Sequence, residues 1–271
     1  MRRAAIVLGI IAALLIVAFA FATGGIPSRE PAAWLTAQPI AHRGQWTSGP
    51  SRPENSLAAF EEAAENGFAV ELDVHHSSDG HVVIIHDEAI EAMTGEPGMV
   101  SEMTLAELKE QRLLGGTETI PTLEEALELI DGRVPVFVEI KNPGDVGALE
   151  DDVAAQLVAY EGNAAVMSFN PFSLARVAGA ASDIPRGQLS SAFEGEDLAW
   201  YEVFLLSNLL MNWTSKPDFI AYDLAELPSV GTTLQKWRGR PLLGWTAEDE
   251  AEWIAAEGLV DAVIADPGGL P

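Results

Sequence analysis

Short apolar runs rich in β-forming residues alternate with helical patterns along most of the chain, and this alternation limits the fold more than any other feature. A repeated strand–helix order predicts parallel strands joined by helices that cross over one face. Eight such units between residues 39 and 271 predict an α/β fold of the (β/α)8 type, known as a TIM barrel, which typically has about 250 residues. The expected strands are 39–41, 68–73, 134–139, 164–168, 185–189, 219–222, 241–245 and 262–265.

Helix-start signals support these units. Ser56 follows Asn55 before an apolar helical stretch, and Thr104 and Thr122 each have a glutamate three residues later, which is the capping-box spacing. A doubly wound sheet is the alternative, but the chain has neither of the glycine-rich phosphate loops that often accompany that fold. The Gly-x-Ser-x-Gly elbow of α/β-hydrolases is absent too.

The first residues predict a membrane signal. No charged side chain occurs between Ala4 and Thr23, and as a helix this run would be roughly 30 Å long, about the thickness of a bilayer core. Arg2 and Arg3 precede it, so the positive-inside rule places the following domain outside the cytoplasm. An uncleaved anchor and a signal peptide cleaved near Ala20–Ala22 both remain open. The expected organisation is segment 1–23, a linker over 24–37 and the barrel over 38–271.

Charge and cysteine content exclude several classes of protein. The formal net charge is −26, which is unsuited to binding nucleic acid through its phosphates. The absence of cysteine excludes disulfides, thiolate metal sites and a cysteine nucleophile. With 48% hydrophobic residues, the chain is too apolar to be a disordered acidic protein.

Three carboxylates predict a cation site. Glu71 and Asp73 alternate with apolar residues in a predicted strand, so both point to one face. Glu139 ends the next strand of the barrel and can complete the group, because barrel active sites gather at the carboxyl ends of the strands. Neighbouring carboxylates repel each other unless a cation lies between them, and an all-oxygen site suits Mg²⁺ or Ca²⁺. A solvated acidic edge is the alternative reading.

All five histidines lie between residues 42 and 86. His42 follows the first strand. Asp79-Gly80 is a hairpin signal, and a two-residue loop there would place Asp73 opposite His86. Two imidazoles beside a cation predict a general acid and a general base, although a single histidine at a strand end is more often structural. His75 shares the inward face with Asp73, whereas His76 and His81 are expected to be exposed.

Two cations flank these groups. Arg43 follows His42, and Lys141, one of few lysines, lies two residues after Glu139. A divalent ion, an arginine and a lysine around two imidazoles predict a site for a phosphate ester, because the cations can stabilise charge on phosphoryl oxygens.

Nine short segments resemble those of one enzyme family, the glycerophosphodiester phosphodiesterases, and the resemblance extends over residues 38–270. Two departures concern the substrate side: one is Ala92-Met93-Thr94, and the other is the segment 87–116, which by the resemblance forms an insertion after the second strand and is short in this chain. The matching segments are Ala41-His42-Arg43-Gly44, Pro53-Glu54-Asn55-Ser56, Glu71-Leu72-Asp73, Asp79-Gly80, His86-Asp87, Pro121-Thr122-Leu123-Glu124-Glu125, Glu139-Ile140-Lys141, Ser168-Phe169 and Gly244-Trp245-Thr246.

The resemblance implies a TIM barrel that hydrolyses glycerophosphodiesters to an alcohol and glycerol 3-phosphate. It implies acid–base catalysis by two histidines and a divalent cation, Mg²⁺ or Ca²⁺. The roles that it implies are catalytic His42 and His86, metal ligands Glu71, Asp73 and Glu139, Glu54 as an auxiliary ligand or orienting group, phosphate-binding Arg43 and Lys141, and Trp245 as a wall for the glycerol moiety.

Two further functions stay open. One is a lysophospholipase D-like or cyclising phospholipase that acts on lipids. The apolar stretch 199–213 would serve it as a membrane-facing element, although a core-facing barrel helix is the simpler reading. The other is a catalytically dead binding protein tethered to the membrane. The sequence determines neither the alcohol released, nor the division of acid and base roles between the histidines, nor the oligomeric state.

Overall fold

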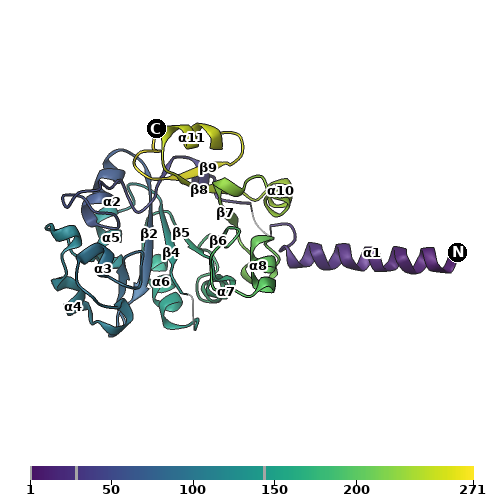
Figure 1. The fold of residues 1–271 in the computed structure, drawn as a ribbon, viewed down its shortest axis with the longest axis horizontal. Coiled ribbons are helices and arrows are strands. Elements are labelled where there is room, and N and C mark those ends of the chain that lie inside the picture. Colours follow the sequence, from purple (N-terminus) through teal and green to yellow (C-terminus); the bar gives the residue numbers. More distant parts are fainter. Residues whose placement is uncertain (1, 28–29, 143–144) are drawn as a thin grey trace.

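A closed parallel barrel forms the body of the protein in a computed structural model that describes residues 2–27, 30–142 and 145–271. β1 pairs with both β2 and β9, which closes the ring (Figure 1). Within the described residues this ring has eight parallel strands, so the predicted (β/α)8 fold is confirmed. They are β1 (Ile40–Ala41), β2 (Ala69–His76), β4 (Val136–Ile140), β5 (Ala164–Ser168), β6 (Arg186–Ser190), β7 (Phe219–Asp223), β8 (Leu242–Ala247) and β9 (Ala262–Ala265).

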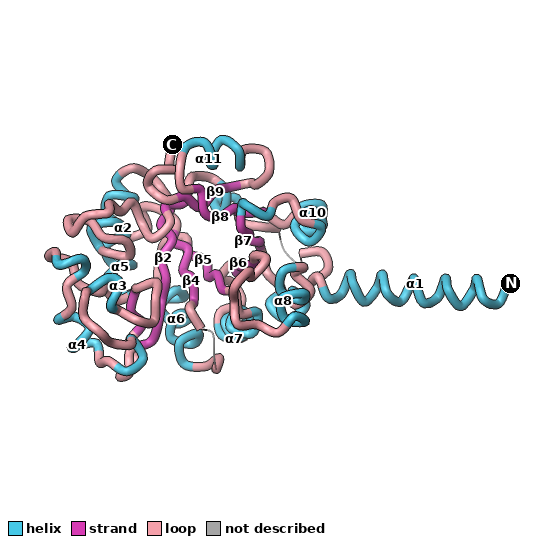
Figure 2. Tube along the Cα trace, in the orientation of Figure 1, coloured by secondary structure: helices cyan, strands magenta, loops and turns pink. Residues whose placement is uncertain are grey.

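Helices surround the ring of strands (Figure 2). The predicted helix starts are confirmed. The Ser56 hydroxyl accepts a hydrogen bond from Ala59 N, and both Thr104 and Thr122 form capping boxes. The outer helices are α2 (Leu57–Glu65), α5 (Leu123–Ile130), α6 (Ala148–Ala159), α7 (Pro171–Ala180), α8 (Trp200–Ser207), α9 (Asn212–Ser215), α10 (Val230–Trp237) and α11 (Glu250–Ala256).

Strand β3 (Val82–Ile84) extends β2 as an antiparallel hairpin, but its register differs from the expected one. Val74 lies opposite Ile84, and Ile85 N donates to Asp73 O, so Asp73 faces Ile85 rather than His86. The loop holds three residues because Ser77 N donates to His81 O, and Gly80 (φ 85°) completes the turn. The two-residue-loop prediction was therefore wrong by one position.

A small subdomain follows the hairpin and has a core of its own. The predicted insertion is confirmed, because these segments lie between β3 and α5 and bury a separate cluster that includes Val83, Ile90 and Leu108. Its elements are α3 (Glu91–Thr94), η2 (Val100–Glu102), α4 (Leu105–Glu110) and η3 (Leu113–Gly115).

Large side chains fill the barrel interior. Phe137 and Phe219 meet edge to face, with their ring centroids 5.9 Å apart. Leu35, from the short helix η1 (Ala33–Thr36), packs into the same cluster. Because the interior is packed, polar chemistry is confined to the mouth at the carboxyl ends of the strands.

The N-terminal helix α1 (Arg2–Ala22) projects sideways from the barrel (Figure 1). Its end is held by α10 and the residues after it: Arg238 Nη1 donates to Thr23 Oγ1 (2.6 Å), and Arg240 donates to the carbonyls of Gly24 and Gly25. Within the described part of the chain, no helix has the length and apolarity required to cross a bilayer.

The core-facing reading of the stretch 199–213 holds only in part: Leu209 is buried in a core cluster with Ile220 and Tyr222, whereas helix α8 is more exposed. None of its residues is buried, and Trp200 is 80% exposed. Phe204, one turn further on, is exposed as well.

Candidate active site

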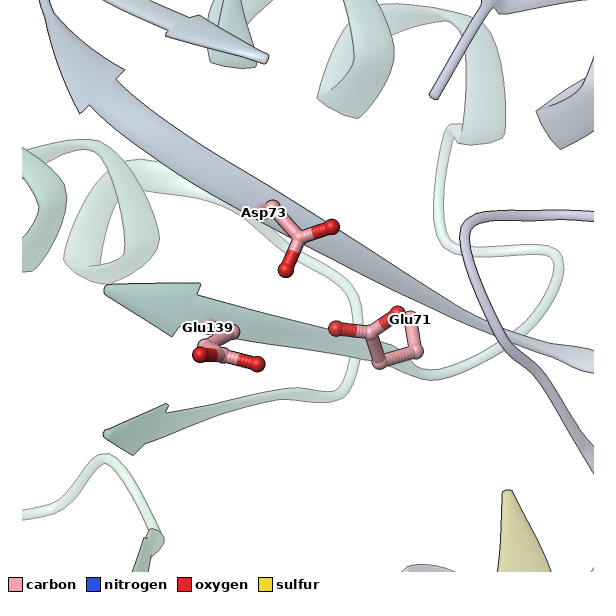
Figure 3. A group of neighbouring side chains, drawn as sticks. All are labelled: Glu71, Asp73 and Glu139. Atoms are coloured by element: carbon pink, nitrogen blue, oxygen red, sulfur yellow. The ribbon is translucent and has the colours of Figure 1, made fainter. Parts of the chain in front are cut away.

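Three carboxylates meet at the barrel mouth, as the sequence predicts. Asp73 in β2 lies directly opposite Glu139 in β4, and Glu71 points to the same side as Asp73 (Figure 3). All three are buried, and each offers an oxygen within 4.8 Å of the others. The alternation of β2 is the cause, because residues 71 and 73 share a face with the pleat of a strand.

The carboxylates carry more negative charge than the site readily accommodates. Burial and the neighbouring Asp73 raise the pKa of Glu71 to about 8. Burial, opposed by Lys141 and reinforced by Asp73, also raises the pKa of Glu139. Burial disfavours ionised Asp73 too, but the charges of Lys141, His86 and Arg43 outweigh it and lower the pKa of Asp73. A hard divalent cation fits this group, because it prefers carboxylate oxygens and would offset the excess charge.

Asp73 is the best-supported member of the group. Lys141 Nζ lies 3.1 Å from Asp73 Oδ1 and 2.8 Å from Glu139 Oε1, so one ammonium bridges two carboxylates. On the other side, Asn55 Nδ2 donates to Asp73 Oδ2 at 2.8 Å. Asn55 belongs to a helix start and to one of the family-like segments, but the sequence gives no sign that it holds Asp73.

Arg43 lies in a tight turn directly after β1. Its φ of 57° is in the left-handed region, and its amide donates to Glu71 Oε2 at 2.9 Å. The guanidinium donates from Nη1 to Glu54 Oε1 at 2.9 Å and places Nε 3.5 Å from Asp73 Oδ2. Glu54 thus pairs with Arg43 and lies outside the group of three carboxylates.

His42 begins the same turn and is held by a residue that follows β9, the strand that pairs with β1. Its Nδ1 lies 2.7 Å from Oδ1 of Asp266, which follows β9. Burial opposes charge on His42, but the hydrogen bond to Asp266 and the negative charge of Glu71 outweigh it and raise the pKa of His42. The sequence alone assigns Asp266 no role, because no local pattern reveals a partner 224 positions away.

His86 has its own carboxylate and an opposite pKa shift. Its Nδ1 lies 2.7 Å from Oδ1 of the adjacent Asp87. Burial lowers the pKa of His86 and, with the positive charges of Lys141 and Arg43, outweighs the opposing effect of Asp73. Behind it, His75 is buried, with Nε2 3.0 Å from His86 O and Nδ1 3.1 Å from Glu88.

Aromatic side chains form another part of the mouth. Trp245 in β8 meets Phe169, which follows β5, edge to face at 5.6 Å between ring centroids. Phe169 in turn contacts Phe193. Both Trp245 and Phe169 pack on the interior cluster of the barrel, so they present rigid apolar surface beside the polar groups.

Two imidazoles, a buried carboxylate group and two cations at the mouth of a TIM barrel define a class of enzyme that can act on phosphate esters. The sequence profile of the glycerophosphoryl diester phosphodiesterase family matches residues 42–269, and the chain belongs to that family. It is therefore an enzyme that hydrolyses glycerophosphodiesters.

Individual relatives agree with this assignment. A glycerophosphodiester phosphodiesterase of Caldanaerobacter subterraneus is 38% identical over 152 residues, which are 50% of this chain and 59% of that relative. Human glycerophosphodiester phosphodiesterase 1 is 26% identical over 264 residues, covering 84% of this chain and 78% of the relative. The solved structure of an Oleispira antarctica phosphodiesterase, in complex with its product sn-glycerol-3-phosphate, has a TM-score of 0.69 and 29% identity, covering 87% of this chain and 95% of that one.

Proposed function

We propose that the protein cleaves glycerophosphodiesters to an alcohol and glycerol 3-phosphate by acid–base catalysis with His42 and His86. The observation that carries this proposal is the presence of two imidazoles, each with a carboxylate on Nδ1, at the mouth that also holds the buried carboxylate group. The product in the Oleispira antarctica complex supports glycerol 3-phosphate as the phosphorylated product.

The opposite pKa shifts support a division of roles between the imidazoles. His86, whose pKa is lowered, is neutral near pH 7 and accepts a proton from the attacking oxygen, which belongs to water or to the 2-hydroxyl of glycerol. His42, whose pKa is raised, keeps its proton to higher pH than an ordinary histidine and donates it to the alcohol oxygen as the bond between that oxygen and phosphorus breaks. The sequence alone leaves this division open.

Glu71, Asp73 and Glu139 would hold the divalent ion, either Mg²⁺ or Ca²⁺. When bound, it supplies positive charge that stabilises the phosphoryl oxygens in the transition state. Arg43 and Lys141 place further positive charge at this point, and Trp245 with Phe169 offers an apolar wall for the glycerol carbons.

Release of glycerol 3-phosphate from glycerophosphocholine is the direct test. We expect EDTA to abolish release and added Mg²⁺ or Ca²⁺ to restore it. A His42→Ala/His86→Ala double variant should lose activity by about 100-fold or more, whereas His81→Ala, at an exposed hairpin position, should keep it. Undiminished release of glycerol 3-phosphate in EDTA would contradict the assigned cation site, and undiminished release by the double variant would contradict the assigned histidines. Binding of the diester without turnover in the presence of any of these ions would favour the alternative of a catalytically dead binding protein.

A lipid substrate is the second candidate, and exposed aromatic side chains favour it. Trp200 in α8 and Trp237 in α10 are 80% and 87% exposed, and Phe204 is also exposed. Amphipathic aromatic residues of this kind are typical of the membrane interface. Comparing turnover of glycerophosphocholine with that of lysolipid micelles separates the two candidates. A Trp200→Ala/Phe204→Ala variant should lose only lysolipid turnover if this candidate is right.

For localisation, we propose that the barrel lies outside the cytoplasm and that residues 1–23 direct it there, as a retained membrane anchor or as a signal peptide. The basic start and uncharged run support this. Because Thr23, Gly24 and Gly25 bind α10 and the residues after it, cleavage is expected no later than Ala22 if it occurs. The mass of the mature N-terminus tests this limit, and a chain that begins after Gly25 would contradict it.

A further inference from the structure

The partner of His42 is distant in the sequence but belongs to the neighbouring strand of the barrel, because Asp266 follows β9 and β9 pairs with β1. Asp266 Oδ1 accepts a hydrogen bond from His42 Nδ1 at 2.7 Å, and both side chains are only about one-fifth to one-quarter exposed (20% and 24%). A carboxylate on Nδ1 fixes the neutral ring in one tautomer and leaves Nε2 as the nitrogen available for proton transfer.

The main chain around Asp266 is locked in place by close packing. Asp266 N donates to Ala247 O at 2.9 Å, and Gly269 N donates back to Asp266 O at 2.8 Å. A Cβ on Gly269 would lie 2.3 Å from Ala247 O, so only glycine permits this approach. The turn after β9 is therefore tied to the end of β8, and Asp266 has little freedom to move.

His42 is also tied to β9 through its backbone, because His42 N donates to Ala265 O at 2.9 Å. The ring and its carboxylate thus share one rigid attachment at the seam where β1 meets β9. The corresponding pair on the other imidazole differs: the Asp87 side chain is 57% exposed and comes from the residue next to His86. Water can replace an exposed partner more readily than a fixed, largely buried one.

We propose that Asp266 is a positioning residue for His42, one that sets the tautomer and direction of the imidazole so that Nε2 serves as the proton donor. Asp266 does not touch the substrate in this proposal; it acts through His42. The inference rests on the proposed role of His42 in catalysis, so one arm of its test must be independent of turnover.

The kinetic arm compares two variants with a matched control. Asp266→Ala should lower kcat by roughly 10–100-fold, as for other groups that orient a catalytic histidine, with KM changed less than about three-fold. Asp266→Asn keeps an oxygen that can accept from Nδ1 and should recover part of kcat. Both should move the alkaline limb of the pH–rate profile to lower pH, because they remove the charge that favours protonated His42.

Asp261→Asn is the control, since Asp261 Oδ2 accepts from Leu242 N next to the same strand but has no contact with His42. It should lower thermal stability and leave the pH profile unchanged. If Asp266→Ala changes only stability, as the control does, Asp266 is purely structural and the proposal is overturned.

The independent arm is the nitrogen NMR signal of His42, identified by its loss in His42→Ala. In the parent protein we expect Nδ1 to carry the proton in the neutral ring, and in Asp266→Ala a mixture of both tautomers. The same mixture in the parent would overturn the positioning role. If the parent shows one fixed tautomer but His42→Ala keeps normal turnover, the proposed function is overturned and the contact between His42 and Asp266 stands.

Discussion

Single residues determine the charge state of each carboxylate in the site. Asp73 is surrounded by Lys141, Arg43 and Asn55, whereas Glu71 receives one backbone hydrogen bond, from Arg43. This imbalance explains why the pKa of Asp73 falls and that of Glu71 rises although the two are neighbours on one face. Glu71 is consequently the carboxylate that gains most from a bound cation.

A bell-shaped pH dependence is the first prediction at this scale. The acidic limb of kcat/KM should reflect protonation of His86 below pH 6.5, because its pKa is lowered, and the alkaline limb should reflect loss of the proton from His42 above pH 6.5, because its pKa is raised. Asp87→Asn removes a charge that favours protonated His86 and should shift the acidic limb alone to lower pH. A shift of the alkaline limb in that variant would reverse the assigned roles.

At the level of elements, the strands form the barrel and the turns after them position functional side chains such as His42 and Arg43. Strand positions 164–168 and 262–265 were predicted to the residue, because β-branched and small apolar residues bounded by helix signals leave little choice. The hairpin register was missed by one residue, because the loop length is decided by Ser77 and Gly80 and not by the Asp79-Gly80 pair alone. The turn after β1 gave no local sign that its arginine would adopt a left-handed backbone.

Substitution at Gly44 tests the importance of that turn. Gly44 has φ 79°, and a Cβ there would lie 2.8 Å from the carbonyl carbon of Ala59 in α2. Gly44→Ala should cost about 1–3 kcal/mol of stability, a fall in Tm of roughly 2–12 °C. It should also lower kcat, because His42 and Arg43 would be displaced.

Gly49→Ala is the matched control, since no atom lies within 4 Å of the added carbon. Its stability should change by less than about 0.5 kcal/mol. Parent-like kcat in folded Gly44→Ala would show that the turn tolerates movement and that this account of it is wrong.

At the scale of the whole molecule, the net negative charge and the closed barrel determine where a cation can act. A net charge of −26 repels an anionic diester, so positive charge must be concentrated at the mouth. The repeat pattern predicted the barrel and the three carboxylates, which follow from strand alternation. It did not reveal the contacts of Asp266 or Asn55, because these join segments that the repeat treats as separate units.

A divalent cation should therefore stabilise the protein, and more so at pH 8 than at pH 5. The folded-state pKa of Glu71, about 8, exceeds its ordinary value of 4.5, so the stability linked to its proton is present below pH 4.5 and is lost as pH rises to 8. A cation at 100 times its Kd adds about 2.7 kcal/mol, or roughly 5–10 °C in Tm for a protein of this size.

Differential scanning calorimetry with EDTA, Mg²⁺ or Ca²⁺ at both pH values measures this effect. Glu71→Gln removes the titrating group and isolates its contribution from those of the histidines. That variant should be more stable than the parent without cation at pH 8 and should respond weakly to added cation. An equal rise in Tm for variant and parent would place the ion elsewhere.

The seam between β1 and β9 has a consequence for synthesis on the ribosome. His42 emerges early, yet its backbone and side-chain partners, Ala265 and Asp266, belong to the last strand and the turn after it. A nascent chain that has not yet released this turn lacks the partners that hold His42. With the proposed role of His42, we therefore expect no hydrolysis of diesters until the last strand has emerged and the ring can close.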